Sequence, residues 1–172
     1  MKHFVFLLVI AFISCETTEM DPVDINWTKK NSSELNKNLA IQEEINIKLF
    51  LEMRKDWILT KTGSGLQYYI YEHGDKEAVI HPGSGDIAEI EYEVKLLDGT
   101  VVSKTESDEY EEFKVDNSNI ESGVQEAVKL LTVGDHAKLI IPSHIGHGLI
   151  GDMDKIPPLT TLVIDIYLLG LK

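Results

Sequence analysis

The sequence predicts an α+β fold in which a twisted antiparallel β-sheet wraps around a short helix. Segments with strand-like alternation outnumber helical segments, and the clearest of them, residues 89–96, alternates apolar with charged side chains. One short helical segment, 122–131, is followed by two segments rich in branched apolar residues, 136–141 and 161–169. Many strands and one short helix are typical of a sheet that packs on a single internal helix.

Composition limits the number of domains and the kinds of partner. A length of 172 residues with 43% hydrophobic content allows one sizeable core, so we expect one globular domain with appendages. The 16 basic and 29 acidic residues give a formal net charge of -13. This sign repels phosphate backbones, and we therefore expect no nucleic acid partner.

The first residues have the features of a bacterial lipoprotein signal peptide. Lys2 gives a short positive region, and residues 4–13 are an apolar run too short to span a bilayer. The run ends at Cys15, the only cysteine, in a Phe-Ile-Ser-Cys sequence that resembles a lipobox, although Phe12 departs from the usual leucine. The alternative is an ordinary signal peptide with an incidental cysteine.

The lipobox interpretation sets the boundaries at the amino terminus. We expect residues 1–14 to be the signal peptide and residues 15–31 to be a linker that is lipid-anchored, with a palmitate-like acyl chain, at Cys15. The domain would then stand in the periplasm or at the outer membrane of a bacterial cell envelope.

Residues 32–59 are predicted to form an amino-terminal helix that is capped near Asn31. This segment has no Pro or Gly, and its apolar side chains recur at spacings of four, at Ile41, Ile45, Leu49, Met53 and Trp57. The resulting stripe indicates packing on the following domain. The alternative is that residues 32–57 form a homodimer or bind another protein.

Residues 60–172 are predicted to form the folded domain. Alternation predicts strands at 66–71, 89–96 and 113–115, and Asp98-Gly99 predicts a hairpin turn. The charged stretch between 104 and 112 is either a solvated loop or a contact with a partner. Ser122 and Gln125 have the spacing of a capping box at the start of a short helix that ends at Gly134.

Four motifs in this order and spacing resemble the FKBP-type peptidyl-prolyl cis-trans isomerases over about residues 65–171. They are Leu96-Leu97-Asp98-Gly99, Val133-Gly134-Asp135, Ile141-Pro142-Ser143 running to Gly148, and Ile156-Pro157-Pro158. The segment 115–124, Ile150-Gly151-Asp152 and the lipobox further resemble the lipoprotein branch of this family that is associated with gliding motility.

The resemblance implies an activity and a partner. Members of this family accelerate rotation about Xaa-Pro bonds without a metal or cofactor, and a dry apolar pocket favours the twisted transition state. The implied partners are proline-containing segments, and the implied role is protein folding of secreted or surface proteins. We expect no cofactor.

The resemblance also assigns site residues. The predicted catalytic residues are Tyr92, which matches the family's first-strand pocket tyrosine, and His147, which stands where the family has a tyrosine that donates a hydroxyl. The predicted substrate-binding residues are Val102, Ser103, Phe113, Ile120, Glu121, Val124, Ile156 and Ile164. For Glu121, the expected contribution is its backbone N–H.

Several of these positions depart from the family pattern. Val102 and Ile164 replace phenylalanines, Ser103 replaces an aspartate, and Val124 replaces a tryptophan. An aromatic side chain buries on the order of 150–250 Å². The loss leaves open a second function, that of a catalytically weak or inactive binding or chaperone module of a secretion or gliding-motility apparatus.

Two further alternatives concern single residues. Tyr92 by itself could be an ordinary core tyrosine. His144 and His147 lie near Asp152, but this pair has no helix, cysteine or third histidine beside it, so we expect no metal.

Overall fold

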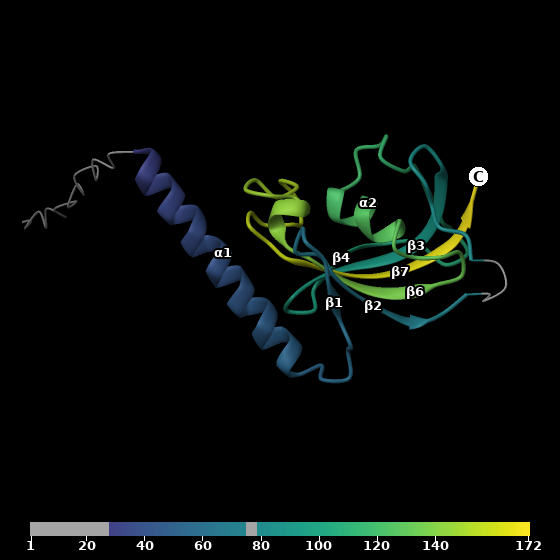
Figure 1. Ribbon diagram of the computed structural model, residues 1–172, viewed down its shortest axis with the longest axis horizontal. Coiled ribbons are helices and arrows are strands. Elements are labelled where there is room, and N and C mark those ends of the chain that lie inside the picture. Colours follow the sequence, from purple (N-terminus) through teal and green to yellow (C-terminus); the bar gives the residue numbers. More distant parts are fainter. Residues whose placement is uncertain (1–27, 75–78) are drawn as a thin grey trace, which may run out of the picture.

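The computed structural model describes residues 28–74 and 79–172. The predicted signal peptide, Cys15 and most of the predicted linker lie outside the described residues. Within the described ranges, no helix is both long and apolar enough to cross a membrane. In Figure 1, helix α1 runs obliquely beside one end of a β-sheet, and helix α2 lies on the sheet.

The described residues form two α-helices, one 3-10 helix and one seven-stranded sheet. In chain order the elements are α1 (Lys29–Glu52), β1 (Thr60–Lys61), β2 (Gln67–Glu72), β3 (Ile87–Leu96), β4 (Val101–Lys104), β5 (Glu111–Lys114), α2 (Ser122–Val128), β6 (His136–Ile141), η1 (Ser143–Ile145) and β7 (Leu162–Leu171). The strand order is β1-β2-β6-β7-β3-β4, and β5 also pairs with β3. All pairs are antiparallel.

The main core lies between the sheet and α2. Val124, Ala127 and Val128 of α2 are buried together with alternate residues of the central strands, such as Leu139 of β6 and Ile166 of β7. The apolar face predicted for residues 89–96 also belongs to this core. The predicted twisted antiparallel sheet on a short helix is therefore confirmed.

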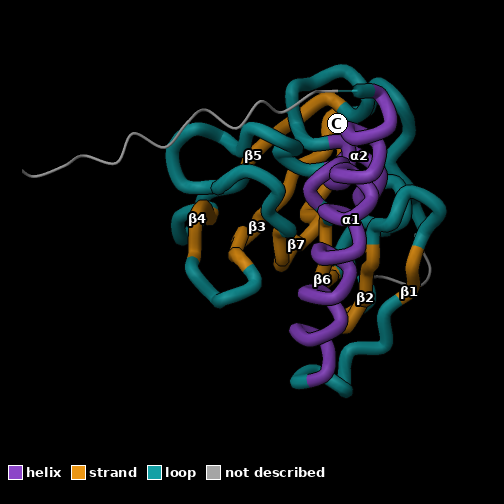
Figure 2. The backbone as a smooth tube through the Cα atoms, turned by 90° about the vertical axis from the view of Figure 1, so that its left-hand side faces the viewer, coloured by secondary structure: helices purple, strands orange, loops and turns teal. Residues whose placement is uncertain are grey.

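The carboxyl half of α1 packs on the opposite face of the sheet. Ile47 and Phe50 are buried against Ile140 of β6 and Val163 of β7, the residues that alternate with the main-core positions. Figure 2 shows α1 crossing in front of the strands on this side. The expectation that the helix packs on the following domain is confirmed.

Of the predicted stripe, Trp57, which follows the end of α1, packs against this cluster beside Phe50, but the other four residues do not. Ile41, Ile45, Leu49 and Met53 are 46%, 44%, 57% and 79% exposed. At 3.6 residues per turn, each step of four residues advances by about 40° around the axis, so a stripe with this spacing drifts away from any one face. Packing on the sheet instead selects Ile47 and Phe50.

The bounds of α1 also differ from the prediction of 32–59. Thr28, rather than Asn31, is the N-cap, since its Oγ1 accepts a hydrogen bond from the Asn31 backbone N–H. The helix ends at Glu52, where the guanidinium of Arg54 donates to the Phe50 carbonyl at 3.0 Å and lies over the Phe50 ring. This side-chain contact satisfies one of the carbonyls at the end of the helix.

The capping box predicted at the start of α2 is wrong. The N-cap is Glu121, and the Ser122 hydroxyl donates to the Ile145 carbonyl at 3.2 Å. The buried Gln125 side chain instead accepts from the Asp116 backbone N–H at 2.8 Å and donates to Ser118 Oγ at 2.8 Å. Both side chains hold neighbouring loops in place. The helix also ends at Val128, before Gly134.

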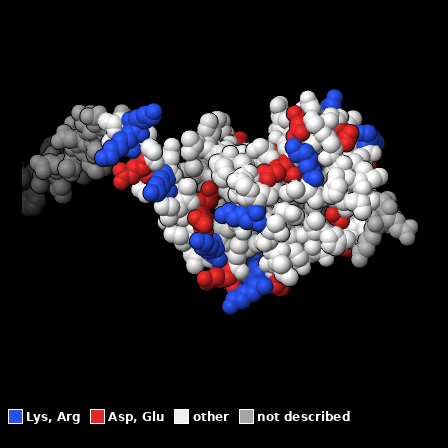
Figure 3. Space-filling view, viewed as in Figure 1, with Lys and Arg blue, Asp and Glu red and all other residues white. Residues whose placement is uncertain are grey.

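Charged side chains of both signs are mixed on the surface. On the face in Figure 3, Lys and Arg side chains alternate with Asp and Glu along α1 and around the body. The prediction that nucleic acid is not a partner stays a prediction, and it rests on the net charge.

Candidate functional site

A cavity of about 230 Å³ lies between the inner face of the sheet, the start of α2 and the loop that precedes β7. Its lining comes from β3, β4, β5, α2, β7 and two loops. The lining residues are Ile90, Tyr92, Val94, Ser103, Glu111, Ile120, Glu121, Val124, His147, Asp152, Ile156, Leu162, Ile164 and Ile166. The cavity therefore joins segments separated by more than seventy residues in the sequence.

The floor of the cavity is aliphatic. Val124, Ile156 and Ile164 are buried there, beside the inward residues of β3 and β7. Strand alternation explains the contribution of β7, because residues 162, 164 and 166 point to the same face. Among the described lining residues, Tyr92 is the only one with a phenol, phenyl or indole ring.

Tyr92 presents its hydroxyl at the wall of the cavity. The hydroxyl donates to Glu111 Oε1 at 2.6 Å and lies 3.4 Å from Ser103 Oγ. Burial, and then the hydrogen bond to the Glu111 carboxylate, raise the pKa of Tyr92. The phenol is thus protonated across the physiological pH range, and it remains a hydrogen-bond donor.

His147 and two more carboxylates stand at the mouth. His147 Nε2 lies 2.7 Å from Glu121 Oε1, and both side chains are partly exposed. Asp152 Oδ1 accepts the backbone N–H groups of Asp154 at 2.9 Å and Ile156 at 2.7 Å. These hydrogen bonds lower the pKa of Asp152, so its carboxylate is ionised at neutral pH.

The structure brings most of the predicted site residues to this cavity. Eight of the ten predicted catalytic and substrate-binding residues line it: Tyr92, Ser103, Ile120, Glu121, Val124, His147, Ile156 and Ile164. Their roles towards a substrate stay predictions.

Val102 and Phe113 are not in the lining of this cavity, and their assignment as substrate-binding residues stays a prediction. Val102 has no partner on β3, because the register of β3 and β4 shifts at this point. Its side chain is buried in the core. Phe113 of β5 pairs with Ala88 of β3, and its side chain is also buried in the core.

Sequence reasoning missed six lining residues. Strand alternation could have identified four of them as inward-facing, namely Ile90, Val94, Leu162 and Ile166. Glu111 and Asp152 belong to charged, loop-rich stretches in which no periodicity marks a residue as facing a cavity.

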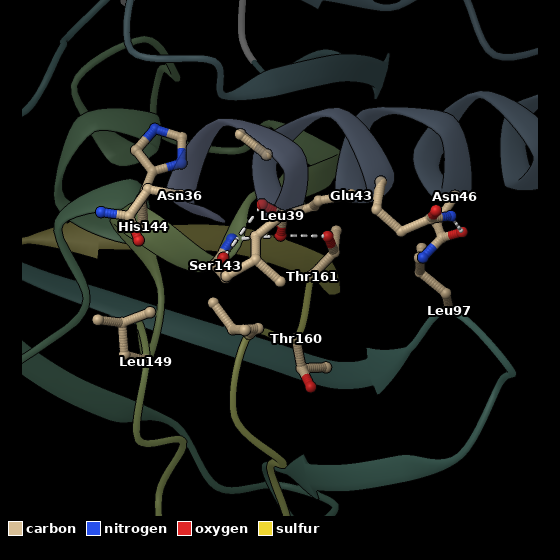
Figure 4. A pocket seen from close by; sticks show the side chains of 13 residues that line it. Asn36, Leu39, Glu43, Asn46, Leu97, Ser143, His144, Leu149, Thr160 and Thr161 are labelled. Atoms are coloured by element: carbon tan, nitrogen blue, oxygen red, sulfur yellow. Dashed lines mark hydrogen bonds between the residues drawn. The ribbon is translucent and has the colours of Figure 1, made fainter. Parts of the chain in front are cut away.

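A second and larger cavity, the α1 groove, has a volume of about 520 Å³ and separates α1 from the loops around 143–149 and 159–161. Leu39 and Glu43 of α1 line one side, and Ser143, Leu149 and Thr161 line the other (Figure 4). Four amide and hydroxyl side chains add to this lining, those of Asn36, Gln42, Asn46 and Thr160.

The two histidines of the loop belong to different cavities. His144 lines the α1 groove, where its Nε2 lies 2.8 Å from the Ser64 carbonyl, whereas His147 lines the smaller cavity. The described residues contain no group of three or more His, Cys, Asp or Glu side chains that could hold a metal ion. The expectation that the protein needs no metal stays a prediction.

Comparison with known proteins connects this geometry to one family. The sequence model of the family "FKBP-type peptidyl-prolyl cis-trans isomerase" matches residues 79–169, which is more than half of the chain. The match includes every lining residue of the smaller cavity and excludes α1.

Individual relatives agree with this match. The chain is 38% identical over 114 residues to the "Probable FKBP-type peptidyl-prolyl cis-trans isomerase FkpA" of Neisseria meningitidis, covering 66% of this chain and 40% of the relative. It is 32% identical over 149 residues to the "Outer membrane protein MIP" of Legionella longbeachae, covering 83% of this chain and 60% of the relative. The chain thus spans about half the length of these curated relatives.

A solved structure gives the same result for the fold. The crystal structure of FkpA from Escherichia coli superimposes with a TM-score of 0.66 at 27% identity, over 82% of this chain and 64% of that one. The matched motifs, the antiparallel sheet on α2 and the relatives agree, and the chain belongs to the FKBP-type peptidyl-prolyl cis-trans isomerase family.

Proposed function

We propose that the chain is a peptidyl-prolyl cis-trans isomerase that seats a proline ring in the cavity beside Tyr92. The observation that carries this proposal is an aliphatic cavity of about 230 Å³ with a phenol and an imidazole at its edge. A mostly apolar pocket with a few polar groups is typical of sites for small ligand groups. The partner that fits this chemistry is a proline-containing polypeptide segment.

The reaction requires little from the protein beyond polarity and orientation. The barrier to rotation, about 18–20 kcal/mol, comes from the partial double bond of the amide. Buried Val124, Ile156 and Ile164 give the floor a low polarity, which favours the twisted amide over the more polar planar amide. The phenol of Tyr92 donates its one proton to Glu111, and the ring of His147 faces Glu121, so we expect the backbone N–H of Glu121 to bond a substrate carbonyl.

Glu111 supports activity despite the replacement of the family aspartate by Ser103. The phenol of Tyr92 donates to a carboxylate at 2.6 Å, but this carboxylate comes from β5 instead of β4. Because a hydrogen bond to a charged acceptor is strong, Glu111 orients the phenol as an aspartate at position 103 could. The phenol therefore keeps a carboxylate partner although the family aspartate is replaced by Ser103.

A refolding experiment tests the function. A client protein whose slow folding phase is limited by proline isomerisation, over tens of seconds, should refold faster when the purified chain is added. We expect the rate constant of this phase to increase in proportion to chain concentration, with the faster phases unchanged. An unchanged slow phase at high chain concentration would contradict the proposal.

The second candidate function is a binding or chaperone module, and the α1 groove favours it. This groove is more than twice as large as the smaller cavity, and its apolar and amide side chains suit an extended polypeptide. A module of this kind would raise the refolding yield of a proline-free client without changing any rate constant. If the chain leaves that yield unchanged, the second function is excluded.

We also propose that the chain is anchored at Cys15 to a membrane of the bacterial envelope. The lipobox-like sequence supports the anchor, and one relative carries the name "Outer membrane protein MIP". In a bacterial host, the wild-type chain should sediment with membranes and carry the added mass of acyl chains, whereas Cys15→Ser should do neither. A cleaved, unmodified wild-type chain would contradict lipidation. A relation to gliding motility stays a prediction from the motifs.

A further inference from the structure

We propose that Glu43, on the appended helix α1, is a positioning residue that holds the loop side of the proline-binding cavity in place. The inference rests on the proposed isomerase function. It concerns a residue outside the segment that matches the family, since that segment begins at residue 79. In this chain α1 would therefore contribute to the site without touching the substrate.

The carboxylate of Glu43 accepts three hydrogen bonds across the α1 groove, drawn as dashed lines in Figure 4. Oε1 accepts the backbone N–H of Ser143 at 2.7 Å and the hydroxyl of Thr161 at 2.7 Å. Oε2 accepts the hydroxyl of Ser143 at 3.0 Å. Ser143 and Thr161 are only 5% and 3% exposed, so water cannot easily replace the carboxylate as their partner.

Ser143 and Thr161 are the two ends of one segment. Between them lie His147, Asp152 and Ile156, which are the loop residues that line the smaller cavity. One carboxylate thus ties both ends of the segment to a single point on α1. Fixing the ends of a loop removes conformational freedom from everything between them.

Ser143 also forms hydrogen bonds within the segment. The Ser143 carbonyl accepts the backbone N–H groups of Gly146 at 3.0 Å and Gly148 at 2.8 Å, on either side of His147. The backbone N–H of Leu159 donates to the Gly148 carbonyl at 2.9 Å. A displacement of Ser143 is therefore passed to His147 through two short hydrogen bonds.

All three donors to Glu43 are neutral groups, and the ion pairs found among the described residues do not include Glu43. The contact therefore needs acceptor geometry rather than negative charge. In Glu43→Gln the amide oxygen can accept from the Ser143 N–H and from Thr161, and the amide nitrogen can donate to Ser143 Oγ. Glu43→Ala removes all three bonds.

The test uses the full chain in four forms: wild type, Glu43→Ala, Glu43→Gln and the matched control Glu44→Ala. Glu44 is the next residue on α1, and its carboxylate is exposed and faces Lys48 and Lys61. Three quantities are measured: kcat/KM on an Xaa-Pro peptide, the amide NMR signals of Gly146 and Gly148, and the thermal unfolding midpoint.

We expect Glu43→Ala to lower kcat/KM roughly three- to tenfold and to shift or broaden both amide signals. Glu43→Gln should stay within about twofold of wild type, and Glu44→Ala should match wild type. Equal rates and equal amide signals for Glu43→Ala and Glu44→Ala would overturn the proposal. So would a Glu43→Gln variant as impaired as Glu43→Ala.

Two controls keep the outcomes separate. If wild type does not accelerate exchange, the proposed function fails, but the amide signals still decide whether Glu43 positions the loop. If Glu43→Ala does not fold, Thr161→Val removes one of the three bonds with little change in shape. We expect this variant to shift the same signals by a smaller amount, and unshifted signals would overturn the proposal.

Discussion

The hydroxyl of Tyr92 depends on two neighbours that come from different strands. The hydroxyl donates a hydrogen bond to Glu111 on β5, and Ser103 on β4 lies at the edge of hydrogen-bond distance. The sequence identified Tyr92 and Ser103 through their place in motifs. It could not identify Glu111, because that residue reaches the phenol only through the pairing of β5 with β3.

At this scale we expect Tyr92→Phe to lower kcat/KM roughly three- to tenfold, since the hydrogen bond from the phenol to Glu111 that fixes this wall of the cavity is lost while the apolar ring is kept. The matched control is Tyr69→Phe, on β2 outside the cavity lining. Rates are measured by NMR exchange on an Xaa-Pro peptide. Equal rates for the two variants would show that the phenol has no role.

Asp135 is a buried carboxylate whose ionisation should stabilise the fold. It is 2% exposed and accepts the backbone N–H groups of Gly74 at 3.0 Å and Thr132 at 2.8 Å. Burial alone would raise the pKa of Asp135, but these hydrogen bonds outweigh burial and lower it. Because the folded pKa is below the unfolded value of about 3.9, the stabilisation is complete above that pH and is lost as the pH falls through the folded pKa.

We therefore expect Asp135→Asn to lower the free energy of unfolding by about 1–3 kcal/mol at neutral pH. The difference from wild type should shrink below about pH 4, as measured by urea unfolding. Asp56→Asn, at an exposed carboxylate, serves as the control. A difference that is as large at pH 3 as at pH 7 would contradict the assignment.

At the scale of elements, strands were easier to predict than the details of helices. In residues 89–96, the alternation of apolar and charged side chains predicts which face points inward, and that face packs in the main core. For α1, the face that packs depends on which residues of β6 and β7 point outward, and a helix sequence does not contain that information. The same holds for Gln125, whose partners lie in the preceding turn.

The exposed side of α1 allows a test of the predicted association through residues 32–57. Ile41, Ile45 and Leu49 are about half exposed, and they lie away from the face that packs on the sheet. If this side joins two copies, wild type should sediment as a dimer and Ile45→Glu as a monomer, because a buried charge would be unpaired. Ile58→Glu, an exposed site after the helix, is the control. A monomeric wild type at high concentration would exclude the homodimer.

At the scale of the whole molecule, two helices cover opposite faces of one sheet and meet the same loop. α2 lines the smaller cavity through Val124, and α1 reaches the loop of that cavity through Glu43. Motif order predicted the sheet, α2 and most of the cavity. It could not predict the contribution of Glu43, because contacts separated by 100 and 118 residues leave no local pattern.

The central claim is that a cavity with one phenol and an aliphatic floor still catalyses prolyl isomerisation. The most direct measurement is NMR exchange between the cis and trans forms of an Xaa-Pro peptide, without a protease, as wild-type chain is added. We expect the exchange rate to rise linearly with chain concentration and to fall several-fold with Tyr92→Phe. An exchange rate that stays at the uncatalysed value, at a chain concentration that saturates peptide binding, would contradict the claim.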